Sequence, residues 1–234
     1  SFAGNDTGLK DLFKNGQRRG LVDGIDVIEF NLVYSNSDSF ISRTWTFFKY
    51  VARSLILIFK ENYDIVFATT TPLTAGIPGI VAKHFRRKPF VFEVRDLWPE
   101  LPKAMGVIKN PFLLSLMSAL EWVSYHSADH IIALSPGIAD GIKVRGIDDH
   151  FISLIPNGCD LDIFDGSLQL WRPEAIDDND FLAIFAGTHG VANGLDDVLD
   201  AAKELCKRKR DDIKILLIGN GKLKLSLIER ANRE

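Results

Sequence analysis

The chain has 234 residues, of which 46% are hydrophobic and 25% charged, a composition typical of a globular protein with a substantial core. Its formal net charge of −3 gives no electrostatic reason to expect nucleic acid as a partner. The two cysteines, Cys159 and Cys206, have no partners at metal-ligand spacing and are too few for a disulfide framework, which favours a reducing compartment. The histidines form no HExxH motif, and we expect no metal site.

Apolar runs alternate with helical patterns from residue 26 onward, which predicts an α/β protein. Strands are expected, after a polar loop, at residues 26–33, 64–69, 89–94, 130–134, 151–155, 181–186 and 213–218. Helices are expected at residues 45–60, between the second and third strands, at 110–126, 136–146 and 195–208, and after residue 221. Asn110 and Ser135, each followed by proline, are predicted N-caps. Parallel strands need such crossover helices, so we expect doubly wound Rossmann-like sheets.

The composition changes between residues 160 and 180, where Asp, Pro and Gly are frequent and no periodicity is sustained. A stretch of this kind is typical of a boundary between domains. We therefore predict two domains, residues 1–165 and residues 166–234. The second offers only two strands, too few for a sheet that is stable alone, so this domain is expected to be incomplete.

Residues 45–60, WTFFKYVARSLILIFK, form the most apolar predicted helix. The segment is too short and too interrupted by charge to span a bilayer. Its polar positions recur at helical spacing and fall on one stripe: Thr46, Lys49, Arg53 and Lys60. This pattern favours a core helix with one solvated edge. The alternative is a basic amphipathic helix that rests on a membrane surface.

Residues 64–99 form a predicted βαβ unit with charged residues at its end. The crossover helix contains Gly76 and Gly79, which allow close packing against the sheet. The second strand ends in Arg95 and Asp96. Because ligands of open α/β sheets bind outside the carboxyl ends of the strands, this guanidinium and carboxylate are candidates for substrate contact. The alternative is an ordinary surface ion pair that caps the loop.

Two glycine turns follow strands in the second half of the chain. Residues 187–194, GTHGVANG, lie between a strand and a helix, and Gly219-Asn220-Gly221 repeats the arrangement after the next strand. Free backbone N–H groups and a helix N-terminus favour phosphate at such positions. Neither turn matches the GxGxxG or GxxxxGK[ST] pattern in full, so a tight turn without a ligand is an equally good interpretation.

Several linked segments resemble retaining GT-B glycosyltransferases of family 4. The segment SADHIIALSPGIADGIKVRGIDDHFISLIPNGCDLDIF is similar to the part that closes their first domain. FAGTHGVANGLDDVLDAAKEL is similar to the opening of their donor domain, and ILLIGNGKLKLSL to the strand and glycine turn that follow. FEVRDLWPELPKAMGVI resembles the bacterial branch that builds O-antigen, capsule and colanic-acid type glycans.

The resemblance implies a GT-B-like fold and a reaction. A hexose or N-acetylhexosamine would pass from a nucleotide-diphosphate sugar to a glycan or lipid-linked acceptor, with retention of anomeric configuration and an oxocarbenium-like transition state. The resemblance implies no metal and no cofactor besides the donor substrate. A lipid-linked acceptor implies a cytoplasmic protein attached to the inner face of the cytoplasmic membrane, with Lys49, Arg53 and the basic run 84–88 as candidate contacts with anionic lipid.

The resemblance assigns roles to the charged pair of the first domain. Arg95 stands where many relatives have a histidine, and it can hold a hydroxyl or a phosphate but cannot act as a base. Asp96 is the neighbouring group that could take a proton or bind the sugar. These two residues are the predicted catalytic residues.

The predicted donor-binding residues lie in the two glycine turns. Gly187 matches the glycine beside the donor diphosphate, and Gly219 and Gly221 form the next turn. Thr188 and Asn193 stand where many relatives have an arginine and a lysine, so neutral hydrogen bonds or other cations would replace the usual positive clamp.

Two family features have no counterpart in the sequence. The pair of glutamates that holds the donor sugar and ribose is not found before Glu234, and the glycine loop after the opening strand is not found either. We therefore expect a chain that is cut at both ends and inactive on its own. The alternatives are a GT-B-fold sugar-nucleotide epimerase, which would need acid/base carboxylates in its cleft, and a non-catalytic sugar- or nucleotide-binding module.

Overall fold

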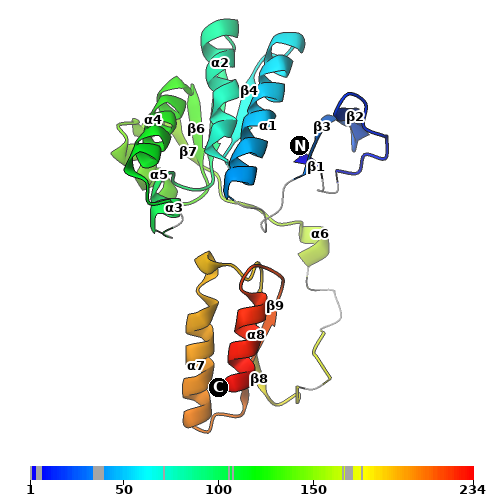
Figure 1. Cartoon of the computed structure of the whole chain (residues 1–234), viewed down its shortest axis with the longest axis vertical. Coiled ribbons are helices and arrows are strands. Elements are labelled where there is room, and N and C mark those ends of the chain that lie inside the picture. The colour runs from blue at the N-terminus through cyan, green and yellow to red at the C-terminus, as the bar shows by residue number, and fades with distance from the viewer. Residues whose placement is uncertain are drawn as a thin grey trace. The chain divides into compact units, whose positions relative to one another are not determined.

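The computed structural model describes residues 2–3, 7–33, 40–70, 72–104, 106, 108–164, 166, 171–174 and 176–234. The chain forms two compact units, Ser1–Gly158 and Cys159–Glu234 (Figure 1). The division lies a few residues before the predicted boundary at 165/166. Each unit is α/β, with strands that alternate with helices along the chain.

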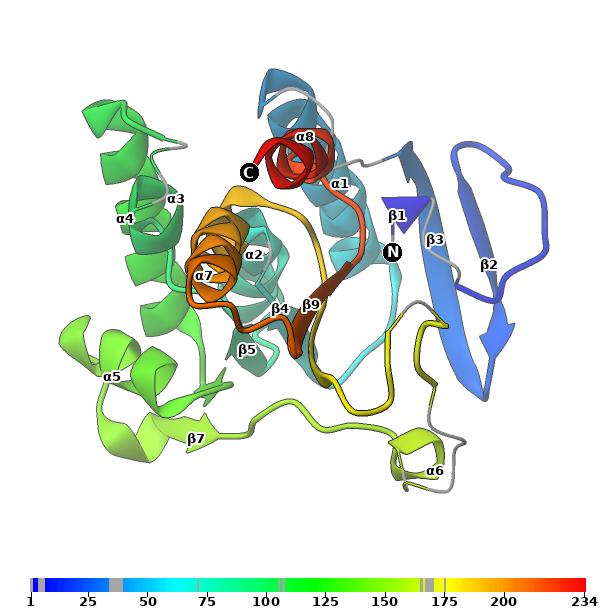
Figure 2. The ribbon, with the colours of Figure 1, turned by 90° about the horizontal axis from the view of Figure 1, so that it is seen from below.

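A small three-stranded sheet opens the first unit. It consists of β1 (Phe2–Ala3), β2 (Gln17–Val22) and β3 (Ile25–Val33) in the order β1-β3-β2 (Figure 2). β2 and β3 are antiparallel, and Asp23 and Gly24 connect them with φ angles of 50° and 81°. Positive φ at both central positions is the geometry of a tight hairpin turn. The expected strand 26–33 is confirmed, but the loop predicted before it is wrong, because β2 pairs with β3 there.

The main sheet of the first unit has four parallel strands in chain order. They are β4 (Val66–Thr69), β5 (Phe90–Val94), β6 (His130–Ala133) and β7 (Ile152–Leu154). The helices of the unit are α1 (Phe40–Lys60), η1 (Leu73–Ala75), α2 (Gly76–Arg86), α3 (Glu100–Ala104), α4 (Pro111–Ser127), α5 (Pro136–Val144) and η2 (Asp149–Phe151). The predicted alternation of strand and helix is therefore confirmed through this unit.

The core lies between this sheet and its helices. Phe90 and Phe92 of β5 are fully buried and pack with Tyr125 of α4 and Ile142 of α5. Burial of side chains of this size contributes about 2 kcal/mol each. A Cβ atom at Gly79 of α2 would lie 2.1 Å from the Phe90 ring, so the expected close packing of this helix is confirmed and depends on glycine.

The predicted N-caps form in the structure. The Asn110 side chain accepts hydrogen bonds from the backbone N–H of Phe112 at 2.9 Å and of Leu113 at 3.2 Å. The Ser135 hydroxyl accepts from the Ile138 N–H at 3.3 Å. A cap of this kind contributes about 1 kcal/mol, and it fixes where α4 and α5 leave the sheet.

Helix α1 is only partly a core helix. Val51 and Ile58 are buried, whereas four large apolar side chains lie on the exposed side: Trp45 (62% exposed), Phe48 (54%), Ile56 (52%) and Phe59 (55%). Arg53 is not on a solvated edge, since it donates to the Gly16 carbonyl and covers the Phe30 ring. In the part of the chain that the structure describes, no helix is long and apolar enough to cross a membrane.

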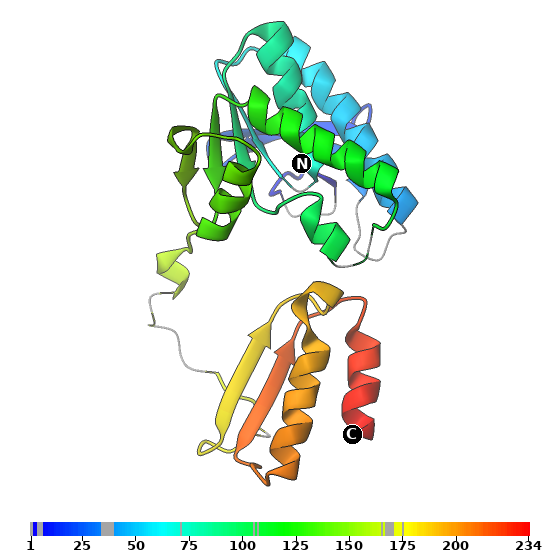
Figure 3. The same cartoon turned by 90° about the vertical axis from the view of Figure 1, so that its left-hand side faces the viewer.

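The second unit contains two parallel strands and two main helices. Its elements are α6 (Leu161–Phe164), β8 (Phe181–Ala186), η3 (Val191–Asn193), α7 (Leu195–Lys207), β9 (Ile213–Ile218) and α8 (Lys224–Arg233). Figure 3 shows α7 and α8 side by side against the strands. Leu195 and Leu227 are buried between them, and Arg230 of α8 pairs with Asp196 and Asp200 of α7.

Candidate functional site

The carboxyl ends of the four parallel strands form one edge of the first unit. Thr70, directly after β4, is buried, and its hydroxyl accepts a hydrogen bond from the Arg95 N–H at 2.8 Å. The Thr70 N–H donates in turn to the Glu93 carbonyl at 2.9 Å. These two bonds fix the backbone where β5 ends, and they therefore position Arg95 and Asp96.

Arg95 is accessible at this edge. Its side chain is exposed, and within the described part of the chain its guanidinium has no hydrogen-bond or ion-pair partner. Asp96 is half-buried beside it. A guanidinium without a partner among the described residues is available to a phosphate or a hydroxyl.

The segment after Asp96 leads directly into α3. The Leu97 side chain packs so closely over α5 that a Cβ atom at Gly141 would lie 2.4 Å from it. Trp98 and Pro99 follow, joined by a cis peptide bond, and both pack into the unit. The candidate catalytic residues are thus attached to a short helix whose position depends on its contacts with α5.

A partly buried ionic cluster contacts this short helix, and no local sequence pattern indicates it. Arg145 Nη2 lies 2.7 Å from Glu100 Oε1 at the start of α3 and 2.7 Å from Glu121 Oε2 in α4. The Tyr125 hydroxyl donates to Glu121 Oε1 at 3.0 Å. The Glu121 side chain is 1% exposed, and burial raises its pKa to about 7 although the Arg145 charge acts in the opposite direction.

The predicted donor-binding residues lie together at the ends of β8 and β9. The loop after β8 is bound to the loop after β9 by backbone hydrogen bonds from Gly187 N–H to the Ile218 carbonyl and from His189 N–H to the Asn220 carbonyl, both 2.9 Å. A Cβ atom at Gly219 would lie 1.8 Å from the Gly187 carbonyl oxygen. A Cβ atom at Gly221 would lie 2.5 Å from the His189 carbonyl oxygen.

Packing alone therefore explains why glycine stands at positions 219 and 221. The loop after β8 presents the groups that remain available to a ligand, since Gly187 and Thr188 are exposed. The Asn193 amide donates to the Thr188 carbonyl, which closes the loop on itself. The structure thus brings all five predicted residues into one place, but it divides them between a supporting turn and an accessible loop.

The N-terminus of α7 is less suited to an anion than the sequence suggested. Gly194 precedes the helix with a φ of 58° and provides no side-chain cap. Asp196 and Asp197 occupy the first turn, where their carboxylates already satisfy the positive end of the helix dipole. Asp196 also pairs with Arg230 at 3.0 Å. In the 187–190 loop, the N–H groups of Gly187, His189 and Gly190 donate to backbone carbonyls, so Thr188 offers the N–H and hydroxyl that remain for a phosphate.

His189 is a residue of this site that the sequence interpretation did not select. It is 4% exposed, and neither ring nitrogen has a hydrogen-bond partner among the described residues. Its ring lies near Phe185, with a centroid distance of 6.4 Å, and beneath the Gly219 turn. The one sequence feature that could have pointed to His189 is its position in a glycine-containing loop directly after a strand.

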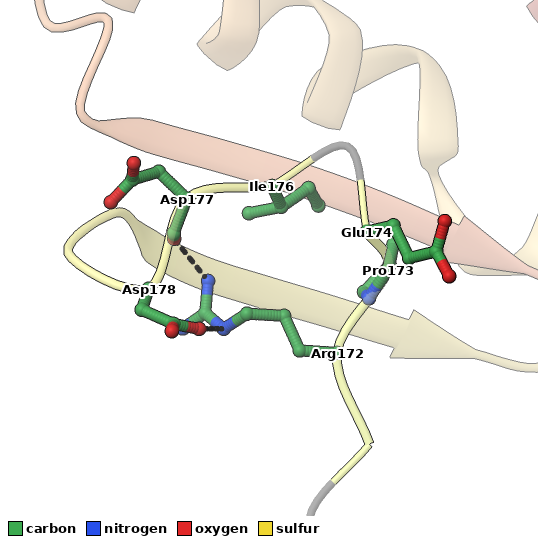
Figure 4. A pocket seen from close by; sticks show the side chains of 6 residues that line it. All are labelled: Arg172, Pro173, Glu174, Ile176, Asp177 and Asp178. Atoms are coloured by element: carbon green, nitrogen blue, oxygen red, sulfur yellow. Dashed lines mark hydrogen bonds and ion pairs between the residues drawn. The ribbon is translucent and has the colours of Figure 1, made fainter.

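Two cavities of the structure lie away from the predicted residues. One, of about 410 Å³, is a polar hollow formed by Arg172 and the loop to Asp178, in which Arg172 donates to the Asp177 carbonyl at 2.9 Å (Figure 4). The other, of about 390 Å³, lies along α7 and β9. Across the described residues, no three His, Cys, Asp or Glu side chains gather as metal ligands.

Solved structures share the fold of this chain. HepE from Anabaena with UDP-glucose superposes with a TM-score of 0.55 at 17% identity, over 80% of this chain and 48% of that one. UDP-GlcNAc 2-epimerase from Neisseria meningitidis bound to UDP-GlcNAc gives 0.51 at 14% identity, over 88% and 54%. MnaA from S. aureus with UDP gives 0.51 at 13% identity, over 88% and 51%. The chain thus spans about half the length of these proteins.

The family is established by the sequence match. No curated protein sequence matches the chain. Residues 11–163, which are 153 of the 234 residues, match the family described as Glycosyltransferase Family 4. Together with the shared architecture, this match shows that the chain belongs to glycosyltransferase family 4 and has a GT-B-like α/β fold.

Proposed function

We propose that this family 4 protein transfers a hexose or N-acetylhexosamine from a nucleotide-diphosphate sugar to a glycan or lipid-linked acceptor in cell-surface polysaccharide synthesis. The observation that carries the proposal is the family match, which includes the sheet edge where Arg95 is exposed and has no partner among the described residues. The nucleotide-sugar donor is supported by structural neighbours solved with UDP-glucose and UDP-GlcNAc. The transfer is proposed to retain anomeric configuration and to need no metal.

The two units supply different chemistry in this proposal. The N–H group and the hydroxyl of the exposed Thr188 contact the donor diphosphate, because the N–H groups of Gly187, His189 and Gly190 already donate to backbone carbonyls. Gly219 and Gly221 pack against this loop and support it. Each such donor aimed at developing negative charge is worth about 10²-fold or more in rate. Arg95 holds a phosphate or a hydroxyl group, and Asp96 binds the sugar or accepts a proton.

The direct experiment is an assay of nucleotide release with a panel of UDP- and GDP-sugars and candidate acceptors. Transfer by the complete enzyme, unchanged in the presence of EDTA and with one anomer formed, is the expected result. We expect the 234 residues alone to give no turnover, and robust turnover by them would contradict the idea that essential donor contacts lie elsewhere. Loss of transfer on metal removal would contradict metal independence.

A sugar-nucleotide epimerase is the second candidate, because some of the structural neighbours are UDP-GlcNAc 2-epimerases. The two reactions differ in their need for an acceptor. An epimerase would convert UDP-GlcNAc to its C2 epimer with no acceptor present, whereas a transferase would leave the sugar unchanged until an acceptor is added. Analysis of the sugar nucleotide by NMR distinguishes them.

We also propose that α1 rests on the anionic inner face of the cytoplasmic membrane. The exposed aromatic row of α1 includes Trp45 and Phe48, and Lys49 is exposed beside them. The basic run 84–88 contributes less than its sequence suggested, because Arg86 donates to the Phe59 carbonyl at 2.9 Å and Lys88 Nζ lies 4.0 Å from the Asp64 carboxylate. The aromatic side chains therefore become the main proposed contacts.

Liposome co-sedimentation tests this attachment. Binding to anionic liposomes that falls with rising salt is expected, and replacement of both Trp45 and Phe48 by alanine is expected to weaken it strongly. The matched control is Phe181→Ala, which removes an equally exposed aromatic side chain from the second unit. No binding to anionic liposomes at low salt would contradict the proposal.

A further inference from the structure

Arg145 connects three helices at the base of the candidate catalytic segment. It is the C-cap of α5, and its guanidinium reaches Glu100 at the start of α3 and Glu121 inside α4. Within the described part of the chain, this guanidinium forms the ion pair that ties α3 to another helix. Glu100 is four residues from Asp96, so the ion pair acts close to the predicted catalytic carboxylate.

The two halves of the bridge differ in exposure. The Glu121 side chain is 1% exposed, whereas the Glu100 side chain is 55% exposed and Arg145 is 26% exposed. The buried Arg145–Glu121 pair holds the guanidinium in place, because the Glu121 carboxyl group offsets the cost of removing the Arg145 charge from water. The exposed half adds little to global stability, but it gives α3 a fixed point of attachment.

Backbone hydrogen bonds connect α3 to the segment that carries Arg95 and Asp96. The Leu101 N–H donates to the Leu97 carbonyl and the Lys103 N–H donates to the Pro99 carbonyl, both at 3.1 Å. The first turn of α3 is thus hydrogen-bonded directly to the segment that follows Asp96. Thr70 holds the other end of this segment through the Arg95 N–H. The segment is therefore fixed at Thr70 on one side and at Arg145 on the other.

We propose that Arg145 is a positioning residue: through Glu100 it holds α3, and with it the Arg95–Asp96 segment, in the arrangement that contacts substrate. This inference rests on the proposed function for its catalytic consequence, but the structural attachment can be measured without turnover. Arg145 itself is not proposed to touch substrate.

Glu100→Gln is the informative variant, because it removes the α3 end of the bridge and leaves the buried Arg145–Glu121 pair intact. Arg145→Met would instead remove the cation from the buried Glu121 carboxyl group, leave it only the Tyr125 hydroxyl, and so destabilise the whole unit. Asp149→Asn is the matched control, since it breaks an exposed ion pair with Lys143 of α5, at 2.6 Å, in which neither partner belongs to α3.

Hydrogen exchange of the whole chain is the first measurement. With Glu100→Gln, the amides of Leu101 and Lys103 are expected to exchange about two- to fivefold faster, while the melting temperature changes little. Asp149→Asn is expected to leave these amides unchanged. Unchanged exchange rates in Glu100→Gln, or the same increase in the Asp149→Asn control, would contradict the claim that the Arg145–Glu100 ion pair holds α3.

Kinetics of the complete enzyme are the second measurement. Glu100→Gln is expected to lower kcat by about two- to fivefold with an unchanged donor KM, because the segment spends more time out of position. Faster exchange with an unchanged kcat would overturn the positioning role. If no form of the enzyme transfers sugar, the proposed function fails, and the exchange result still decides whether Arg145 holds the segment.

Discussion

Glu121 makes the stability of the first unit depend on pH. Its carboxyl group is buried among α4 and α5, where the Tyr125 hydroxyl and the Arg145 guanidinium contact it. Burial raises its pKa from 4.5 to about 7, and the neighbouring Arg145 charge only partly offsets this rise. The folded protein therefore keeps a proton on Glu121 at pH values where the unfolded chain has released it.

The sign and size of the effect follow from linkage. Because the pKa is raised on folding, the contribution of Glu121 is fully present below pH 4.5 and is lost as the pH rises through about 7. The shift corresponds to at most about 3 kcal/mol in all, of which about 2 kcal/mol is lost between about pH 5.5 and about pH 8.5. For a unit of this size, that loss lowers the melting temperature by about 4–8 °C.

Glu121→Gln tests this reasoning, because glutamine keeps an acceptor for the Tyr125 hydroxyl and cannot ionise. The fall in melting temperature between about pH 5.5 and about pH 8.5, followed by circular dichroism, is expected to be about 4–8 °C smaller in the variant. Glu204→Gln is the control, since the pKa of that exposed carboxyl is lowered by Arg208 and it titrates below this range. Identical pH profiles for wild type and Glu121→Gln would refute the argument.

Three further predictions concern the site and its frame. Arg95→Ala and Asp96→Ala are each expected to lower kcat/KM of the complete enzyme by at least about tenfold, or about 1.4 kcal/mol, and unchanged kinetics with a lower melting temperature would indicate a structural role. Gly219→Ala is expected to lower the free energy of unfolding of the second unit by about 2 kcal/mol or more, because the new methyl group would meet the Gly187 carbonyl; denaturant titration measures it, and a neutral effect would contradict the close approach. Asn110→Ala is expected to cost about 1 kcal/mol in the same measurement through loss of the α4 N-cap, with an unchanged value contradicting a stabilising role for the cap.

Local chemistry accounts for the parts of the fold that were predictable. The caps at Asn110 and Ser135 use residues adjacent in sequence, so the pattern alone located α4 and α5. The β2–β3 hairpin was missed although its Asp23-Gly24 turn carries a recognised signal, because the flanking residues alternate too weakly in hydrophobicity.

Long-range contacts account for what the sequence could not show. Glu100 and Arg145 are 45 residues apart, and nothing in either local segment indicates that they meet. The exposed aromatic row of α1 was equally unpredictable, because periodicity shows that a helix has two faces but not which face a neighbour covers. Arg53 illustrates the point, since its contact with Gly16 depends on the missed hairpin.

The glycine turns of the second unit unite two interpretations that the sequence left as alternatives. Gly219 and Gly221 are needed for packing, because side chains there would collide with the carbonyl oxygens of Gly187 and His189. The same close approach permits the backbone hydrogen bonds that fix the 187–190 loop. A loop held in this way keeps the N–H group and hydroxyl of Thr188 in one arrangement, and these are the donors that remain for a diphosphate without a positive clamp. The packing role is therefore the means by which these glycines would support donor binding.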